Sequence, residues 1–285
     1  MIKRITKLTM VMLLIGTVLA FSVMACQSPS ADTNNTYGNW EVDWNGYNPG
    51  PSVSDTPNNG GGDTEEEPPT VVNPVTYTAM IKSNTNALNV RSTPSTGGQV
   101  LGTLDKGDMV RYEDLQNGWY KTVYKERTAY VSASHASVTY MQQASDKVES
   151  VISVGEELLG YPYVWGSQRY HWGNGVINSA FIPGQFDCSA LMQYIFFKGA
   201  GVVMDLNTRT QVLQGVKVDP SDLQRGDVMF FTNDSRVNNT GVERVGHVAL
   251  YLGNNYILHT ASDHAVIEEI SAKRWSYFIV AKRFV

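Results

Sequence analysis

A sharp change in composition near residue 76 divides the chain into a part that cannot bury a core and a part that can. Residues 27–75 are rich in Asn, Pro, Gly, Ser and Thr, and they contain eight acidic residues but no Lys or Arg. Such a segment buries too little apolar surface to offset its chain entropy. The whole chain is 42% hydrophobic, so the residues that can build cores are concentrated elsewhere. We therefore expect 26–75 to be a disordered acidic linker and packed structure to begin at residue 76.

The N-terminus has the pattern of an export signal. Lys3, Arg4 and Lys7 precede an apolar run that ends at Met24, and Cys26 follows directly after Ala25. A basic start and a short apolar run predict a signal peptide over 1–25. The Val-Met-Ala-Cys ending resembles a bacterial lipobox, which implies a lipid on Cys26 and a location at the cell membrane, on its extracytoplasmic face. The alternatives are a plain secretory signal and an uncleaved anchor.

Residues 77–140 alternate short apolar runs with turn residues, which indicates a small antiparallel barrel or sandwich. The expected strands are 88–90, 100–104, 109–112, 119–124 and 128–131. Four elements in order closely resemble a bacterial SH3 (SH3b) domain: LNVRSTPS at 88–95, KGD at 106–108, NGWYK at 117–121 and AYVS at 129–132. The resemblance implies an all-β SH3b barrel over 76–141, which either binds the cell wall or walls one side of a neighbouring cleft. A spacer without a ligand is the alternative.

The remaining residues, 146–285, predict an α+β domain because helical patterns come first and strand patterns follow. Helices are expected over 146–159, from residue 188 onward, and over 206–214. Strands are expected over 227–231, 247–252, 256–260 and 277–283.

Cys188 stands where a helix would activate a thiol. Asp187 is a good N-cap residue, so Cys188 falls in the first helical turn, where free backbone N–H groups and the helix dipole favour thiolate over thiol. If Cys26 carries a lipid, Cys188 is the only thiol left and cannot form an internal disulfide. The alternative is a buried cysteine that acts as a small apolar residue.

His247 and His259 lie on two successive strand patterns, and the turn between them decides whether they meet. A two-residue loop, Asn254-Asn255, would place the two histidines on opposite faces of the sheet. A three-residue loop that begins at Gly253 would pair Leu252 with Tyr256 and place His259 opposite Ala249, diagonal to His247 on one face. We expect the three-residue loop, because a Cys near one oriented His is the arrangement that activates a thiol.

Five elements in order resemble the NlpC/P60 family of peptidoglycan endopeptidases: YPYVWG at 161–166, FDCS at 186–189, RGDVMFF at 225–231, GHVALYLG at 246–253 and ILH at 257–259. The resemblance implies a papain-like domain that cleaves peptidoglycan stem peptides, typically between γ-D-glutamate and a diamino acid. By position it implies that Cys188 is the nucleophile, His247 the general base and His259 its orienter. The matching substrate-subsite residues are Tyr163, Asp187 and Ser189.

The expected partners are stem peptides and, through the lipid anchor, the membrane. We expect a monomer, no cofactor and no nucleic acid. A zinc site at the histidines is disfavoured because no tight pair such as C-x-x-C is present. Two other functions stay open: an amidase or acyltransferase of the same fold, and a wall-binding lipoprotein without activity.

The connection Ser167–Gln185 is long for a compact domain, and loops of this length are usually functional or disordered. Its own apolar residues favour order. We expect a partly ordered flap over or beside the substrate groove, with bends at Gly173 and Gly175 and with His171 at the rim. The alternative is a surface elaboration far from the chemistry.

Overall fold

A computed structural model of the chain describes residues 74–261 and 263–285, all of which lie within one compact unit. The predicted signal peptide, Cys26 and the linker up to residue 73 lie outside the described residues. None of the helices in the described part of the chain is long and apolar enough to cross a membrane.

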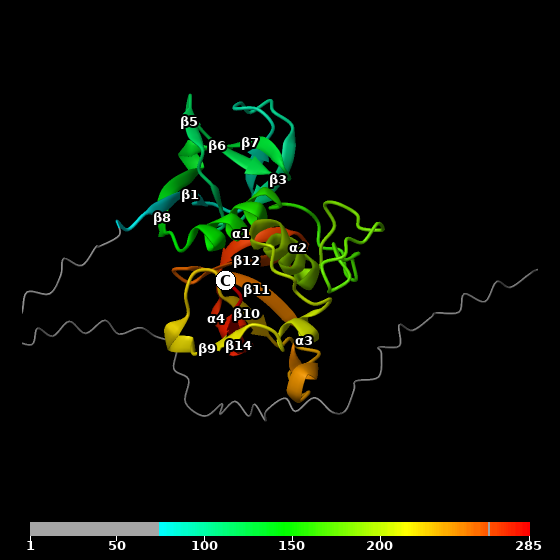
Figure 1. Ribbon diagram of the computed structural model, residues 1–285. Helices are drawn as coiled ribbons and strands as arrows, with labels where there is room; N and C mark the ends of the chain where they lie inside the picture. The colour runs from blue at the N-terminus through cyan, green and yellow to red at the C-terminus, as the bar shows by residue number, and fades with distance from the viewer. Residues whose placement is uncertain (1–73, 262) are drawn as a thin grey trace, which may run out of the picture. The chain divides into compact units, whose positions relative to one another are not determined.

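The first described part is a β-barrel, as the alternating pattern predicts. A three-stranded sheet has the order β4-β1-β8 and a five-stranded sheet the order β3-β2-β7-β6-β5, and neighbours within each sheet are antiparallel (Figure 1). Apolar side chains fill its interior, among them Ile81, Val90, Val110 and Val131, each with no exposed surface. The strands are β1 (Tyr77–Ser83), β2 (Leu88–Arg91), β3 (Val100–Leu104), β4 (Met109–Arg111), β5 (Asp114–Gln116), β6 (Trp119–Tyr124), β7 (Arg127–Ser132) and β8 (Ala136–Gln142). The sequence patterns within 77–140 had not singled out β1, β5 and β8.

The second part, from residue 146 onward, is the C-terminal domain, and it confirms the α+β class. One antiparallel sheet has the order β13-β12-β11-β10-β14-β9, and α2 packs against both α1 and the strands β11 and β12 (Figure 1). The helices are α1 (Asp146–Glu157), α2 (Cys188–Ala200), α3 (Thr208–Gln211) and α4 (Ala272–Ser276). The strands are β9 (Val216–Val218), β10 (Val228–Phe231), β11 (His247–Gly253), β12 (Tyr256–Thr260), β13 (Ala265–Glu269) and β14 (Phe278–Arg283).

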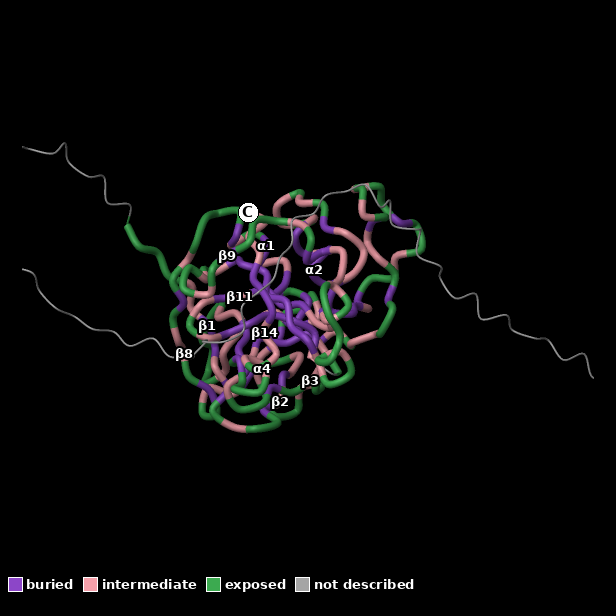
Figure 2. Tube along the Cα trace, turned by 90° about the horizontal axis from the view of Figure 1, so that it is seen from below, coloured by how far each residue is buried: buried purple, intermediate pink, exposed green. Residues whose placement is uncertain are grey.

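α2 is the central helix of this domain. Asp187 caps it, because its Oδ1 accepts the Ala190 N–H at 2.8 Å, and Gly201 ends it in the left-handed conformation at φ +68°. Leu191, Ile195 and other residues of α2 have no exposed surface. Figure 2 shows the buried chain running through the middle of the molecule at β11 and β14. Burial on most sides therefore fixes the helix, and with it the residue at its first position.

The barrel and the C-terminal domain share an interface. Tyr161 Oη donates to Glu126 at 2.7 Å, and Arg111 donates to Ser153 Oγ at 3.2 Å. Gly160 lies against the ring of Tyr124, where a Cβ would come within 2.1 Å of a ring atom, and its φ of +85° also favours glycine. The two domains are therefore in direct contact at these residues.

The hairpin that joins β11 to β12 differs from the expected turn. Gly253 pairs with Tyr256, so the loop is Asn254-Asn255 with both residues at positive φ, and the prediction that Leu252 pairs with Tyr256 is wrong. A bulge between Tyr251 and Gly253 shifts the register by one residue. The bulge restores the predicted face, because the extra residue on β11 returns the two histidines to the same side of the sheet.

Candidate active site

Cys188 is the first residue of α2 and is 8% exposed. The Val248 N–H of β11 donates to its sulfur. Burial raises the pKa of the thiol to about 12, and the Asp187 carboxylate adds to this rise; the Val248 and Ser189 N–H groups and the Arg169 charge oppose it. The predicted lowering of the thiol pKa is therefore wrong, because burial and a neighbouring carboxylate outweigh the partial charge of a helix N-terminus. The resting group is a neutral thiol.

The two histidines meet as the sequence predicts. His247 Nε2 and His259 Nδ1 are 2.9 Å apart, and the rings lie edge to face with their centroids 5.0 Å apart. His259 has no exposed surface. Burial lowers the pKa of both rings; the neighbouring His259 and the Arg274 charge lower that of His247 further. Both imidazoles are therefore neutral near neutral pH.

Glu268 extends this pair and was not predicted from the sequence. Its Oε1 lies 2.9 Å from His259 Nε2 and 3.3 Å from the Arg274 guanidinium. Burial by itself would raise the pKa of Glu268, but the hydrogen bond with His259 and the charge of Arg274 outweigh burial and lower it. The carboxylate is ionised and can only accept.

The ionised Glu268 sets the tautomers of both histidines. His259 must donate from Nε2 to the carboxylate, so in the neutral ring its Nδ1 accepts. His247 must then donate from Nε2 to His259, which leaves His247 Nδ1 without a hydrogen. The hydrogen-bonded line Glu268–His259–His247 therefore ends in a free lone pair on His247 Nδ1. The next residue of the same strand, Val248, contacts Cys188.

A groove of about 610 Å³ opens beside His247. Tyr163 lines it, and the Tyr163 backbone pairs with Phe186, two residues before Cys188. The other lining residues are Thr232, Asn233, Asp234, Gly246, His247, Thr260, Ala261, Ser271, Lys273, Arg274 and Tyr277. Tyr163 therefore links this groove to the segment that leads into Cys188, and a substrate role for Tyr163 stays a prediction.

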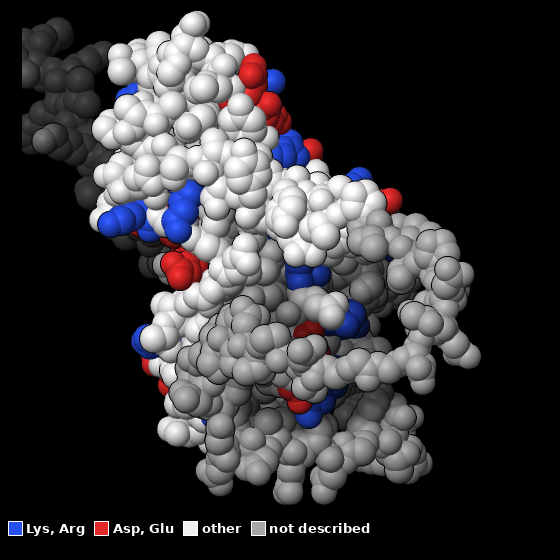
Figure 3. Space-filling model, turned by 90° about the vertical axis from the view of Figure 1, so that its left-hand side faces the viewer, with Lys and Arg blue, Asp and Glu red and all other residues white. Residues whose placement is uncertain are grey.

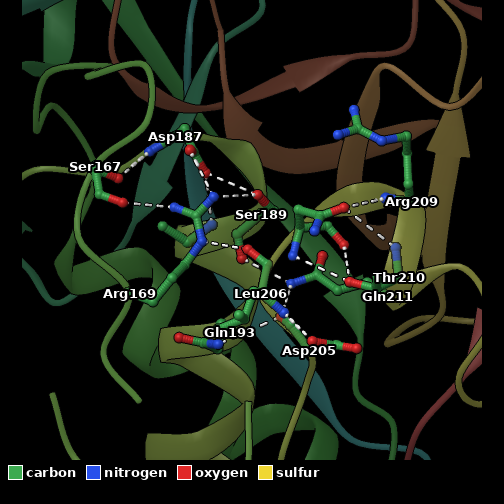
Figure 4. Close-up of polar contacts among 12 residues, drawn as sticks. Ser167, Arg169, Asp187, Ser189, Gln193, Asp205, Leu206, Arg209, Thr210 and Gln211 are labelled. Atoms are coloured by element: carbon green, nitrogen blue, oxygen red, sulfur yellow. Dashed lines mark hydrogen bonds and ion pairs between the residues drawn. The ribbon is translucent and has the colours of Figure 1, made fainter. Parts of the chain in front are cut away.

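Asp187 and Ser189, the other two predicted subsite residues, flank Cys188 but are only 6% and 4% exposed. Arg169 contacts both, at 2.9 Å from Asp187 Oδ2 and 3.1 Å from Ser189 Oγ (Figure 4). A substrate role for these two residues stays a prediction.

The segment Ser167–Gln185 packs on α2. The ring of Tyr170 contacts Tyr194 and Phe197, with centroids 5.0 and 5.6 Å apart. The bends are confirmed, since Gly173 and Gly175 have φ of +79° and +82°. The rim position predicted for His171 is wrong: His171 has no exposed surface and packs against Phe197, because the apolar residues of the segment fold it inward onto the helix.

Within residues 74–261 and 263–285, no group of three or more His, Cys, Asp or Glu side chains is arranged to hold a metal ion. Acidic and basic side chains are interspersed on the face that Figure 3 shows.

Comparison with known proteins identifies both domains. The model of the NlpC/P60 family matches residues 160–283, and that of the bacterial SH3 domain matches residues 86–137. The chain is 27% identical to the gamma-DL-glutamyl hydrolase of Bacillus subtilis over 180 residues, which are 63% of this chain and 37% of that protein. It is 31% identical to the gamma-D-glutamyl-L-lysine dipeptidyl-peptidase of the same organism over 164 residues, 57% of this chain and 48% of that protein. The chain thus spans less than half of the length of either relative.

Among solved structures, an NlpC/P60 family protein from Bacillus cereus is 20% identical to this chain. The match has a TM-score of 0.38 and covers 73% of this chain and 63% of the other. By its family matches, this chain carries an NlpC/P60 domain preceded by a bacterial SH3 domain.

Proposed function

We propose that this protein is a cysteine peptidase that hydrolyses peptidoglycan stem peptides at the bond between γ-D-glutamate and a diamino acid. The observation that carries the proposal is the hydrogen-bonded line Glu268–His259–His247, which leaves one basic nitrogen on the strand that contacts Cys188. The names of the relatives, two of which specify a glutamyl bond, support the choice of substrate.

Because thiol and imidazole both rest neutral, proton transfer and attack belong to one step. The Cys188 sulfur attacks the carbonyl carbon of the scissile amide while its proton moves to His247 Nδ1. The S–C bond forms and the electrons of the C=O double bond move to the oxygen. The backbone N–H of Cys188, at the start of α2, is the expected donor to this oxyanion.

The His247 imidazolium that forms is stabilised by His259 and Glu268. His247 donates to His259, which donates to the Glu268 carboxylate, so negative charge faces the new positive charge through two hydrogen bonds. The resting site therefore avoids the free-energy cost of a buried thiolate and a buried imidazolium, because these charges form only in the transition state. Arg274 holds Glu268 ionised.

The tetrahedral intermediate collapses when His247 gives its Nδ1 proton to the leaving amine. The C–N bond breaks and a thioester on Cys188 remains. Water then attacks the thioester carbon and forms a C–O bond while His247 takes a proton from the water. The second collapse breaks the C–S bond, releases the carboxylic acid and returns the proton from His247 to the sulfur.

The test is digestion of purified muropeptides by the protein, with product masses measured by mass spectrometry. We expect cleavage after γ-D-glutamate by wild type and none by Cys188→Ala. Cleavage between the glycan and the first amino acid would instead identify an amidase, and transfer to an added amine without hydrolysis an acyltransferase. Binding of muropeptides without any product would overturn the proposal in favour of a wall-binding protein.

We also propose that the protein is held by a lipid on Cys26 at the extracytoplasmic face of the cell membrane. The sequence of the first 26 residues supports this location. The acidic linker would then let the enzyme reach substrate away from the membrane surface.

A further inference from the structure

Arg169 belongs to the long Ser167–Gln185 segment, yet its guanidinium is bound beside the start of α2. It donates to the Asp187 carboxylate and to the Ser189 hydroxyl, at 2.9 and 3.1 Å. It also donates to the backbone carbonyls of Ser167, at 2.7 Å, and Leu206. Figure 4 shows the guanidinium enclosed by these partners. The side chain is 16% exposed, so it is held in the interior and is not a mobile surface arginine.

Both oxygens of the Asp187 carboxylate are bound to partners inside the protein. Its Oδ1 accepts the Ala190 N–H at 2.8 Å and the Ser189 hydroxyl at 2.9 Å, and its Oδ2 faces Arg169. The carboxylate is therefore used three times inside the protein. A buried carboxylate in this state needs a cation nearby, because an unpaired buried charge is costly.

The residue that follows Asp187 is the nucleophile of the proposed function. An ionised carboxylate next to Cys188 opposes the negative charge that develops on sulfur during attack. The Asp187 carboxylate thus stabilises helix α2 but disfavours the negative charge on the Cys188 sulfur. A cation on the same carboxylate offsets this effect and leaves the cap hydrogen bond intact.

We propose that Arg169 is a positioning residue for Cys188: it neutralises the Asp187 carboxylate and fixes the first turn of α2, so that an acidic cap can stand directly before a reactive thiol. The long segment that supplies Arg169 is in this view part of the nucleophile's support, and its aromatic side chains anchor it to α2. The inference rests on the proposed function for its catalytic meaning, but it concerns the reactivity of a thiol that can be measured without any substrate.

The experiment measures the rate of Cys188 alkylation by iodoacetamide as a function of pH in otherwise unmodified protein. Arg169→Met removes the cation at similar side-chain length. We expect alkylation at neutral pH to slow about tenfold, because loss of a nearby opposite charge moves a pKa by about one unit or more. Arg169→Lys, which keeps the charge, should recover most of the rate.

Two further variants separate charge from structure. Arg169→Met combined with Asp187→Asn removes both charges and should alkylate at close to the wild-type rate. Arg283→Met is the matched control, because Arg283 on β14 makes a similar pair, at 2.8 Å, with the buried Asp227 directly before β10. It should lower the melting temperature without changing the alkylation profile.

Wild-type alkylation in Arg169→Met, confirmed as folded by circular dichroism, would overturn the inference. So would a double variant as slow as Arg169→Met alone, because the effect would then not pass through Asp187. A protein that hydrolyses no muropeptide but shows the expected alkylation series would refute the proposed function and leave the role of Arg169 standing.

Discussion

Replacing Glu268 by Gln tests the tautomer chain that ends at His247. The amide oxygen of Gln can still accept from His259 Nε2, so the geometry can persist, but the charge is lost. Hydrogen bonds to an ionised acceptor are about twice as strong as neutral ones, a difference of about 1–2 kcal/mol. Glu268 is 32% exposed at its side chain, so solvent weakens the effect toward the lower value. We expect kcat on a muropeptide to fall about tenfold.

The control for this substitution is Glu269→Gln. Glu269 is the next residue of β13, its side chain is exposed, and it contacts Asn255 in the hairpin, not the histidines. It should leave kcat unchanged. A structural effect of removing a carboxylate from this strand would appear in both variants.

The ring nitrogens report the tautomers directly. In ¹⁵N-labelled protein, the neutral rings of His247 and His259 should both carry their hydrogen on Nε2, and Glu268→Gln should make the His259 assignment mixed. A His247 ring that carries its hydrogen on Nδ1 in the wild type would refute the reasoning. Wild-type kcat in Glu268→Gln would refute it as well.

Three other outcomes are expected. The alkylation rate of Cys188 should keep rising with pH through about 8.5 and beyond, because burial raises its thiol pKa to about 12; a plateau below that pH would indicate a resting thiolate. Glu156→Gln should stabilise the protein at high pH. Burial raises the pKa of Glu156 from 4.5 to about 7, so the free energy of unfolding of the wild type should fall as pH rises between these values, by at most about 3 kcal/mol. Thermal denaturation measures this, and equal melting temperatures of the two proteins at pH 8 would contradict it. Cys26→Ser should release the protein from membranes with unchanged activity in solution, and continued attachment in fractionated cells would favour an uncleaved helix.

Much of the fold could be predicted from the sequence because the strands and helices that carry alternating or helical patterns are the ones that bury a face. β11 and α2 are of this kind. β13 was missed, and Glu268 with it, because its buried residues Val266 and Ile267 are adjacent and lack alternation. The carboxylate behind His259 could be inferred only once β13 was known to pair with β12.

Two local predictions were wrong because they depend on the tertiary structure. The bulge between Tyr251 and Gly253 changes the register by one residue, and no property of the sequence distinguishes it from a longer turn. The pKa of Cys188 was predicted from its place in the helix alone. Its direction depends on burial by β11 and on the Asp187 charge, which are tertiary features.

The most direct test of the account is to look for the covalent intermediate on Cys188. Enzyme quenched with acid during turnover of a muropeptide should be heavier than free enzyme by the mass of the N-terminal product, which ends in D-glutamate, less one water. Peptide mapping should place this thioester on Cys188, and Cys188→Ala should show neither the adduct nor hydrolysis. Hydrolysis by Cys188→Ala, or an adduct on any other residue, would contradict the account.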